Sequence, residues 1–198
     1  MHKYFYIIIF VLLASLAAAQ SGSQPMRLEL EARANTEPYQ VLPMAEMGFL
    51  VLFKTNDFED RNNRKWAIAH YNTNMELQWE FIRAILRNHE YAAYSMYGDE
   101  ISLLFFDPRT STESNLQIMT ISPENKQHQV VEGSIDRRFD LMRFSRHKNH
   151  CYLGMNSKNA CKAYNIHVYS GNIQTLELNP EGGTYIENIN IDLSLIHI

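Results

Sequence analysis

The chain has 198 residues, of which 45% are hydrophobic and 20% are charged, and its formal net charge is −4. These values are ordinary for a globular domain that buries a sizeable core, and they exclude a disordered chain. Because the net charge is negative and no Lys- and Arg-rich block stands out along the chain, we expect no nucleic-acid partner.

The first 19 residues have the layout of a secretory signal peptide. Lys3 precedes an apolar segment over residues 4–16, and small residues form an A-x-A site over residues 17–19. The apolar segment is shorter than the ~20 residues that a membrane-spanning helix needs, so a membrane anchor is the less favoured interpretation. We expect cleavage after Ala19, a mature chain that begins at Gln20, a secreted or periplasmic location and no stable membrane insertion.

After a leader over residues 20–38, short apolar and aromatic runs alternate with turn-forming residues. This pattern predicts an all-β fold. A first strand is expected in the leader, at residues 28–32. The other expected strands are 48–53, 65–71, 76–82, 91–97, 100–106, 116–121, 127–132, 140–144, 151–155, 164–169 and 173–178. Three tyrosines, at positions 91, 94 and 97, have helical spacing, so a short helix is the alternative there.

The expected strands repeat in groups of four with a period of about 50 residues. The segments that begin at Gly48, Glu100 and His150 occupy the second place in their groups. Strands 48–53 and 100–106 are apolar on both faces, unlike sandwich strands with one wet face. We therefore expect an incomplete β-propeller, in which Trp66 and Trp79 pack between blades. The expected four-stranded blades cover residues 39–86, 87–138 and 139–180, and a fourth begins before residue 192.

The segments VLPMAEMGFLVLFKTN and KWAIAHYNTNMELQWE, within residues 39–86, resemble repeats of uncharacterised secreted bacterial β-propeller-like proteins. This resemblance implies a propeller fold and an exported protein, and it assigns no catalytic residue. The final segment, LSLIHI at residues 193–198, resembles the in-frame translation of the end sequence that transposase-based sequencing adapters leave on DNA fragments. We therefore expect a non-native tail over residues 193–198 and a truncated chain, with a natural last strand as the alternative.

The two cysteines, Cys151 and Cys161, flank a short turn between two expected strands. In an oxidising compartment this arrangement favours a disulfide, with free thiols as the alternative. A further alternative is a metal site, because thiolate and imidazole are the ligands that zinc prefers. The spacing matches no established zinc pattern, so we expect neither a metal nor another cofactor. The residues of that alternative metal site would be His147, His150, Cys151, Cys161 and His167.

Clustered carboxylates occur over residues 57–60 and at Asp99-Glu100. The first cluster has basic neighbours and lacks the glycine and terminal Glu of a calcium loop, which favours a solvated hairpin tip. The GxSxG, HExxH and P-loop motifs do not occur, so no catalytic residue is assigned. We expect a binding or scaffold module for an extracellular or periplasmic protein, peptide or glycan. The alternative is the N-terminal fragment of a secreted propeller-fold hydrolase or lyase that acts on glycans.

Overall fold

A computed structural model describes residues 27–30, 39–107, 113–124, 126–136, 140–156 and 161–176. The chain divides into two units, Met1–Glu31 and Ala32–Ile198. In the first unit, residues 27–30 form no strand, so the strand expected from residue 28 is absent over 28–30. The expected signal peptide, its cleavage site at Ala19 and Gln20, and the tail at 193–198 lie outside the described residues.

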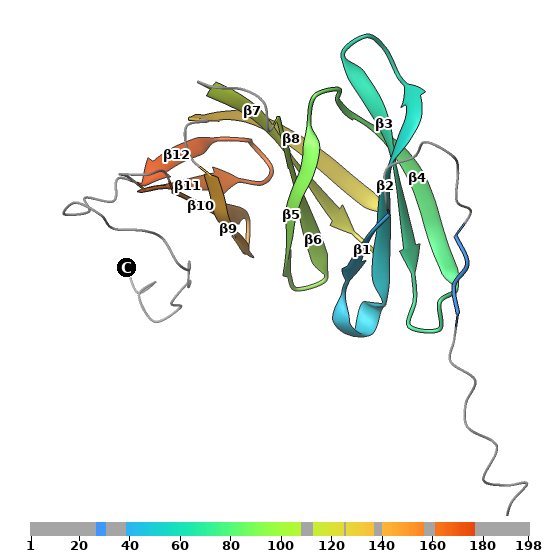
Figure 1. Cartoon of the computed structure of the whole chain (residues 1–198). Helices are drawn as coiled ribbons and strands as arrows, with labels where there is room; N and C mark the ends of the chain where they lie inside the picture. Colours follow the sequence, from blue (N-terminus) through green and yellow to red (C-terminus); the bar gives the residue numbers. More distant parts are fainter. Residues whose placement is uncertain are drawn as a thin grey trace, which may run out of the picture. The chain divides into compact units, whose positions relative to one another are not determined.

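The second unit contains three four-stranded antiparallel sheets in chain order (Figure 1). The first sheet comprises β1 (Gln40–Pro43), β2 (Phe49–Phe58), β3 (Asn63–Tyr71) and β4 (Leu77–Leu86), with the 3-10 helix η1 (Ala45–Met47) between β1 and β2. The second sheet comprises β5 (Glu90–Tyr97), β6 (Glu100–Phe106), β7 (Glu113–Ser122) and β8 (Gln127–Asp136). The third sheet comprises β9 (Asp140–His147), β10 (His150–Asn156), β11 (Cys161–His167) and β12 (Ile173–Leu176). The prediction of an all-β chain with strands grouped in fours is confirmed. No helix among the described residues is long and apolar enough to cross a membrane.

Two local predictions differ from the structure in the first and second sheets. The grouping in fours required a strand before Gly48, but β1 could not be located from the sequence, because it is four residues long, ends at Pro43 and buries only Leu42. The helical alternative for the tyrosine segment is wrong, since β5 is a strand. A register shift between Tyr91 and Ala93 explains the helical spacing. The extra residue places Tyr91 and Tyr94 on the same face, where both pack against the core.

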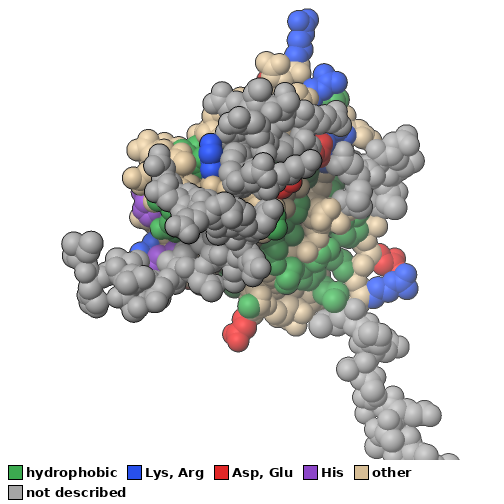
Figure 2. Space-filling view, turned by 60° about the vertical axis from the view of Figure 1, so that its left-hand side comes forward, with side chains coloured by type: hydrophobic (Ala, Val, Ile, Leu, Met, Phe, Trp, Pro, Cys, Tyr) green, Lys and Arg blue, Asp and Glu red, His purple; other side chains and the backbone are tan. Residues whose placement is uncertain are grey.

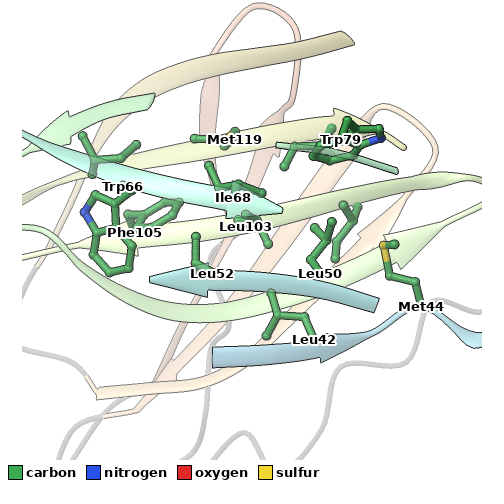
Figure 3. Packing of buried hydrophobic residues seen from close by; sticks show 13 residues of the cluster. Leu42, Met44, Leu50, Leu52, Trp66, Ile68, Trp79, Leu103, Phe105 and Met119 are labelled. Atoms are coloured by element: carbon green, nitrogen blue, oxygen red, sulfur yellow. The ribbon is translucent and has the colours of Figure 1, made fainter. Parts of the chain in front are cut away.

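The first and second sheets enclose one apolar cluster between their facing surfaces (Figure 3). Leu50, Leu52 and Ile68 of the first sheet pack with Leu103 and Phe105 of the second, and all five are fully buried. The two tryptophans contribute as predicted: Trp66 is 3% exposed and Trp79 is 5% exposed. The Trp66 and Phe105 rings meet edge to face, with centroids 5.2 Å apart. Strands that are apolar on both faces therefore bury one face here and leave the other for a neighbouring sheet.

The second and third sheets enclose a second apolar cluster. Leu104, Ile118 and Val131 of the second sheet pack with Leu153 and Met155 of the third. Because side chains alternate along a strand, even-numbered residues of β6 and β7 and odd-numbered residues of β8 face the third sheet. The first strands of the second and third sheets, β5 and β9, also contact each other. The second sheet is thus covered on both faces.

The turns after the first and third strands of each sheet lie at one end of that sheet, which we call the turn end. Three glycines in these turns have positive φ angles, 95° at Gly48, 57° at Gly98 and 72° at Gly171. A Cβ on Gly48 would lie 2.0 Å from the carbonyl oxygen of Tyr71, whereas a Cβ on Gly98 would meet no atom within 4 Å. The turn at Gly48 therefore requires glycine for two reasons, its φ angle and its close approach to the β3–β4 turn.

Candidate functional site

A polar pocket of about 440 Å³ lies at the turn end of the second sheet, where the third sheet faces it. We call it the polar notch. Strands β6, β7 and β8 and the turns beside them supply most of its wall, and the β11–β12 turn contributes Tyr169. The notch is lined by Glu100, Thr120, Ser122, Lys126, Gln127, His128, Gln129 and Tyr169.

The notch exists because one cross-strand row of the second sheet is polar. Ser95, Ser102, Thr120 and Gln129 are direct partners across β5, β6, β7 and β8. Ser102, Thr120 and Gln129 each lie two positions along their strand from a residue of the second apolar cluster, namely Leu104, Ile118 and Val131. They therefore point to the same face, toward the third sheet. Small hydroxyl and amide side chains at this height do not fill the space between the sheets, so the junction opens at the turn end.

The corresponding row of the first sheet shows what closes such a junction. Leu42, Leu50, His70 and Trp79 are direct partners across β1 to β4. Trp79 stacks on Phe81 with centroids 5.5 Å apart, and Phe81 stacks on His128 at 4.4 Å. The Trp79 Nε1 atom donates to the Pro123 carbonyl across 2.6 Å. Large apolar and aromatic side chains therefore seal the junction of the first and second sheets at the height where the next junction is open.

Arg146 of β9 contacts the second sheet beside the polar notch. Its Nη1 atom donates to Ser102 Oγ at 3.1 Å, and the Ser102 and Thr120 hydroxyls lie 3.1 Å apart. Its Nη2 atom forms an ion pair with the Glu100 carboxylate. The side chain of Arg146 is 1% exposed and that of Glu100 is 34% exposed. The Glu100 carboxylate therefore compensates the charge of the buried Arg146 guanidinium. Glu100 also lines the pocket, and its side chain is partly exposed.

The electrostatics of the polar notch suit hydrogen bonding better than acid–base or nucleophilic chemistry. Glu100 supplies the one carboxylate among the described lining residues, and this carboxylate is paired with Arg146. Burial raises the pKa of the Cys151 thiol, which lies near Ser102 and Arg146, to about 11, although the Ser102 hydrogen bond and the Arg146 charge act in the opposite direction. A thiol with that pKa stays protonated at neutral pH and is a poor nucleophile.

The register of the third sheet is incompatible with the predicted disulfide. Cys151 is opposite Ile166, and Cys161 is opposite Asn156, so the cysteines lie five positions apart along the β10–β11 ladder. Five positions correspond to roughly 16 Å, whereas bonded cysteines have Cα atoms within about 7 Å. An odd separation also puts the two side chains on opposite faces of the sheet. Both cysteines are free and buried in the structure.

The third sheet does bring three of the predicted site histidines together. His147 and His167 each pair with His150, so the three form a row across β9, β10 and β11. The His150 and His167 rings lie 5.1 Å apart. They line a second pocket of about 440 Å³, which we call the histidine pocket. Its lining residues are His150, Asn165, His167, Ser170, Asn172, Ile173 and Gln174. Figure 2, which brings the third-sheet side forward, shows histidine side chains gathered at the left-hand edge of that face.

The five residues of the alternative metal site do not converge. Cys151 packs toward the second sheet, on the face opposite the histidine row. Cys161 begins β11, six residues before His167 at its other end. No group of three or more His, Cys, Asp or Glu side chains in the described part of the chain has an arrangement that could hold a metal ion.

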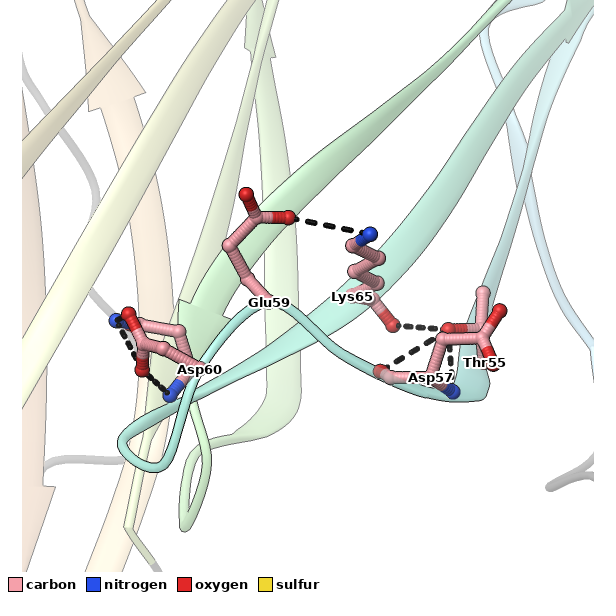
Figure 4. Close-up of polar contacts among 6 residues, drawn as sticks. Thr55, Asp57, Glu59, Asp60 and Lys65 are labelled. Atoms are coloured by element: carbon pink, nitrogen blue, oxygen red, sulfur yellow. Dashed lines mark hydrogen bonds and ion pairs between the residues drawn. The ribbon is translucent and has the colours of Figure 1, made fainter.

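The acidic segment over residues 57–60 forms the predicted hairpin tip (Figure 4). Asp60 Oδ1 accepts hydrogen bonds from the backbone nitrogens of Asn62 at 2.7 Å and Asn63 at 2.9 Å. The hydrogen bond from the Asn63 side chain, followed by the one from the Asn62 backbone, lowers the pKa of the Asp60 carboxyl. Glu59 pairs with Lys65 at 3.3 Å. The carboxylates at 59 and 60 are thus used within the hairpin and do not converge on a cation site.

Sequence reasoning missed most residues of the polar notch. Glu100 was noticed as half of an acidic pair, but its partner Arg146 is 46 residues away. Ser102 carried a usable signal, because it interrupts the apolar run of the expected strand 100–106. Its counterpart in the first repeat is Leu50, so the comparison of repeats marks this position as the place where the pattern changes.

Comparisons with known proteins add no assignment. No protein-family model matches the chain, and no curated protein or solved structure matches it. The polar notch and the histidine pocket are therefore the features of this chain that bear on its function.

Proposed function

We propose that this chain is an exported, non-enzymatic binding module of β-propeller-like architecture, with the polar notch as its ligand site. The stacking of three four-stranded sheets in chain order supports the propeller-like arrangement. The contact between the first strands of two consecutive sheets also supports it, because inner strands of neighbouring blades adjoin a common axis. The resemblance of residues 39–86 to repeats of secreted bacterial propeller-like proteins points the same way.

The observation that carries the proposal is the open junction between the second and third sheets. A protein interior is close-packed, so a pocket of about 440 Å³ between two sheets that pack tightly below it is a specific feature. Its volume lies within the range of small-molecule sites, about 300–1,000 Å³. Hydroxyl, amide and carboxylate groups line it, and these groups orient a polar ligand through hydrogen bonds.

Binding is favoured over glycan hydrolysis by the carboxylate inventory of the notch. Most glycosidases use two carboxylates about 5–9.5 Å apart. Of the described residues that line the notch, Glu100 alone carries a carboxylate, and this carboxylate is already paired with Arg146. Among the described residues, the notch therefore lacks the second carboxylate that this mechanism requires.

The export part of the proposal rests on the first 19 residues and has a direct test. The exported chain should begin at Gln20, as measured by mass spectrometry of the material recovered from the periplasm or the medium. Recovery of the uncut chain in the cytoplasm would contradict export.

Ligand binding is tested with a substitution that fills the polar notch. Ser122 is half-buried in the wall of the notch, so Ser122→Tyr should occupy the pocket without entering the apolar cluster. Thermal shifts are measured for a panel of neutral sugars and dipeptides. We expect at least one member to stabilise the chain, and Ser122→Tyr to abolish that stabilisation. The matched control is Thr73→Tyr, which changes an exposed turn at the turn end of the first sheet. Stabilisation that survives Ser122→Tyr would refute the notch as the ligand site.

A further inference from the structure

The histidine pocket occupies the same place on the third sheet as the polar notch does on the second. Glu100 and His150 are the first residues of β6 and β10, and Ser102 and Tyr152 are the third. The cross-strand row Ser102, Thr120 and Gln129 of the second sheet has its counterpart in Tyr152, Asn165 and Gln174 of the third. The two pockets therefore open on equivalent faces of successive sheets, about one sheet spacing, roughly 10 Å, apart.

Hydrogen bonds fix complementary roles for the two histidines in the histidine pocket. His150 Nδ1 lies 2.7 Å from Asn165 Oδ1 and therefore carries the proton of the neutral ring, which leaves Nε2 as an acceptor. His167 Nδ1 accepts from the backbone nitrogen of Ser170 at 3.2 Å, so its Nε2 carries the proton and donates. Neither Nε2 atom has a partner among the described residues. The pocket thus presents one donor and one acceptor side by side.

The chemistry of both pockets favours a ligand rich in hydroxyl groups and without a strong charge. The Glu100 carboxylate and the Arg146 guanidinium compensate each other, and Lys126 adds one positive charge at the rim of the notch. Hydroxyl, amide and imidazole groups make up most of the remaining lining. Peptide recognition relies on apolar pockets for side chains, and among the described lining residues, apart from the histidines, Tyr169 and Ile173 alone are aromatic or aliphatic.

We propose that the polar notch and the histidine pocket are two subsites for one linear neutral polysaccharide, whose repeating units occupy equivalent positions on the second and third sheets. Similar pockets at a regular spacing match a ligand that repeats its own hydrogen-bonding groups. Once one unit is bound, the next subsite is occupied from a high effective concentration, so affinity rises steeply with ligand length. This inference rests on the proposed function of the notch.

The test measures affinity against ligand length by isothermal titration of the full exported chain. The probes are oligomers of glucose, mannose, galactose and N-acetylglucosamine with one to six units. For the sugar that binds, we expect the longest oligomers to bind at least about tenfold tighter than the monosaccharide. His167→Ala should reduce the affinity of the long oligomers to that of the short ones, while the monosaccharide still binds at the notch. Thr73→Tyr should leave the whole series unchanged.

Different failures separate the inference from the proposed function. Affinity that is independent of length and lost only in Ser122→Tyr would overturn the two-subsite inference and leave the notch as a single site. Binding of dipeptides at the notch, with no sugar bound, would overturn the polysaccharide and retain the binding module. Absence of binding by every sugar and dipeptide would overturn both. Thermal unfolding is recorded for each variant, and His167→Gln replaces His167→Ala if the alanine variant does not fold.

Discussion

Arg146 of the third sheet reaches across the sheet junction to Ser102 of the second, with 3.1 Å between Nη1 and Oγ. The same guanidinium pairs with Glu100, and its Nε donates to the Lys148 carbonyl at 3.0 Å. A comparable ion pair joins the first and second sheets, where Lys54 Nζ lies 2.6 Å from Glu90 Oε1. Each junction thus combines an apolar cluster with one buried cation that is compensated from the neighbouring sheet. Removing one partner of such a pair should therefore lower the free energy of unfolding by a measurable amount.

Replacing Arg146 with methionine should destabilise the fold by roughly 2 kcal/mol, because Ser102 and Glu100 lose a charged partner. The cost is held down by Glu100, which is 34% exposed and can be solvated. Urea denaturation of Arg146→Met, of Glu100→Gln and of the double variant gives the interaction free energy between Arg146 and Glu100. We expect the double variant to lose less free energy of unfolding than the sum of the single variants. Simple additivity would mean that the pair contributes nothing to stability.

Gly48→Ala should destabilise the fold by at least about 3 kcal/mol, since it combines a strained φ angle with a backbone clash. The added Cβ would lie 2.0 Å from the Tyr71 carbonyl oxygen. The matched control is Gly98→Ala, where φ is 57° and nothing lies within 4 Å. That change should cost only about 1 kcal/mol. Chemical denaturation of both variants makes the comparison, and equal losses would show that the close approach at Gly48 is unimportant.

His89 should make the fold sensitive to acid. It is 3% exposed, and its Nδ1 has no hydrogen-bond partner among the described residues. Burial lowers the pKa of His89 from 6.5, although the Asp107 charge, the Gln117 hydrogen bond and the Glu132 charge oppose the shift. The unfolded chain therefore binds a proton first as the pH falls below 6.5. The stability associated with neutral His89 is complete above pH 6.5 and declines below it, by at most about 1.4 kcal/mol per pH unit.

The pH dependence of His89 is measured by urea denaturation of the wild-type chain and of His89→Gln between pH 7.5 and 5. We expect the variant to be less stable at pH 7.5 and to lose less stability on acidification. A wild-type slope that is unchanged in the variant would assign the acid sensitivity to other groups.

Both cysteines should behave as protected free thiols. Cys151 is fully buried and its pKa is raised to about 11, and Cys161 is 6% exposed. A thiol reagent should therefore modify neither residue quickly in the native chain, and both quickly in urea. The intact mass should be the same before and after reduction, because the two cysteines form no internal disulfide. A mass increase of two hydrogens on reduction of the native protein would require a register other than the one described.

The strand pattern was largely predictable because burial on both faces leaves a strong signal in the sequence. Residues 49–53 of β2 and 103–106 of β6 contain no polar residue, and each strand has a neighbour on both sides in its sheet. The grouping in fours implied a strand before Gly48, but β1 could not be located, because an edge strand that buries one residue has no such signal. At β5 the bulge after Tyr91 explains the helical spacing. Residues on one face of a strand are normally two positions apart, and the extra residue makes Tyr91 and Tyr94, which share a face, three positions apart.

The site was less predictable than the fold because it depends on cross-strand register. Cys151 and Cys161 were correctly placed on neighbouring strands, but only the pairing Cys151 with Ile166 reveals that they point to opposite faces. The Arg146–Glu100 pair joins residues 46 positions apart, and no local pattern marks it. The histidine row was visible as a group of residues, whereas the donor and acceptor roles of its members come from Asn165 and Ser170.

The three equivalent cross-strand rows imply a simple route by which proteins of this kind can diverge. Exchanging Ser102, Thr120 and Gln129 for the leucine, histidine and tryptophan found at the matching heights of the first sheet would close the notch without altering any turn. Exchanging Leu50, His70 and Trp79 for serine, threonine and glutamine would open the junction of the first and second sheets. A recognition site can therefore be created or erased by substitutions within strands, while the apolar clusters lower in the same strands keep specifying the architecture. Adaptation to new ligands then needs no loop insertion, although an exchange at Ser102 would also require a new partner for the buried Arg146 guanidinium.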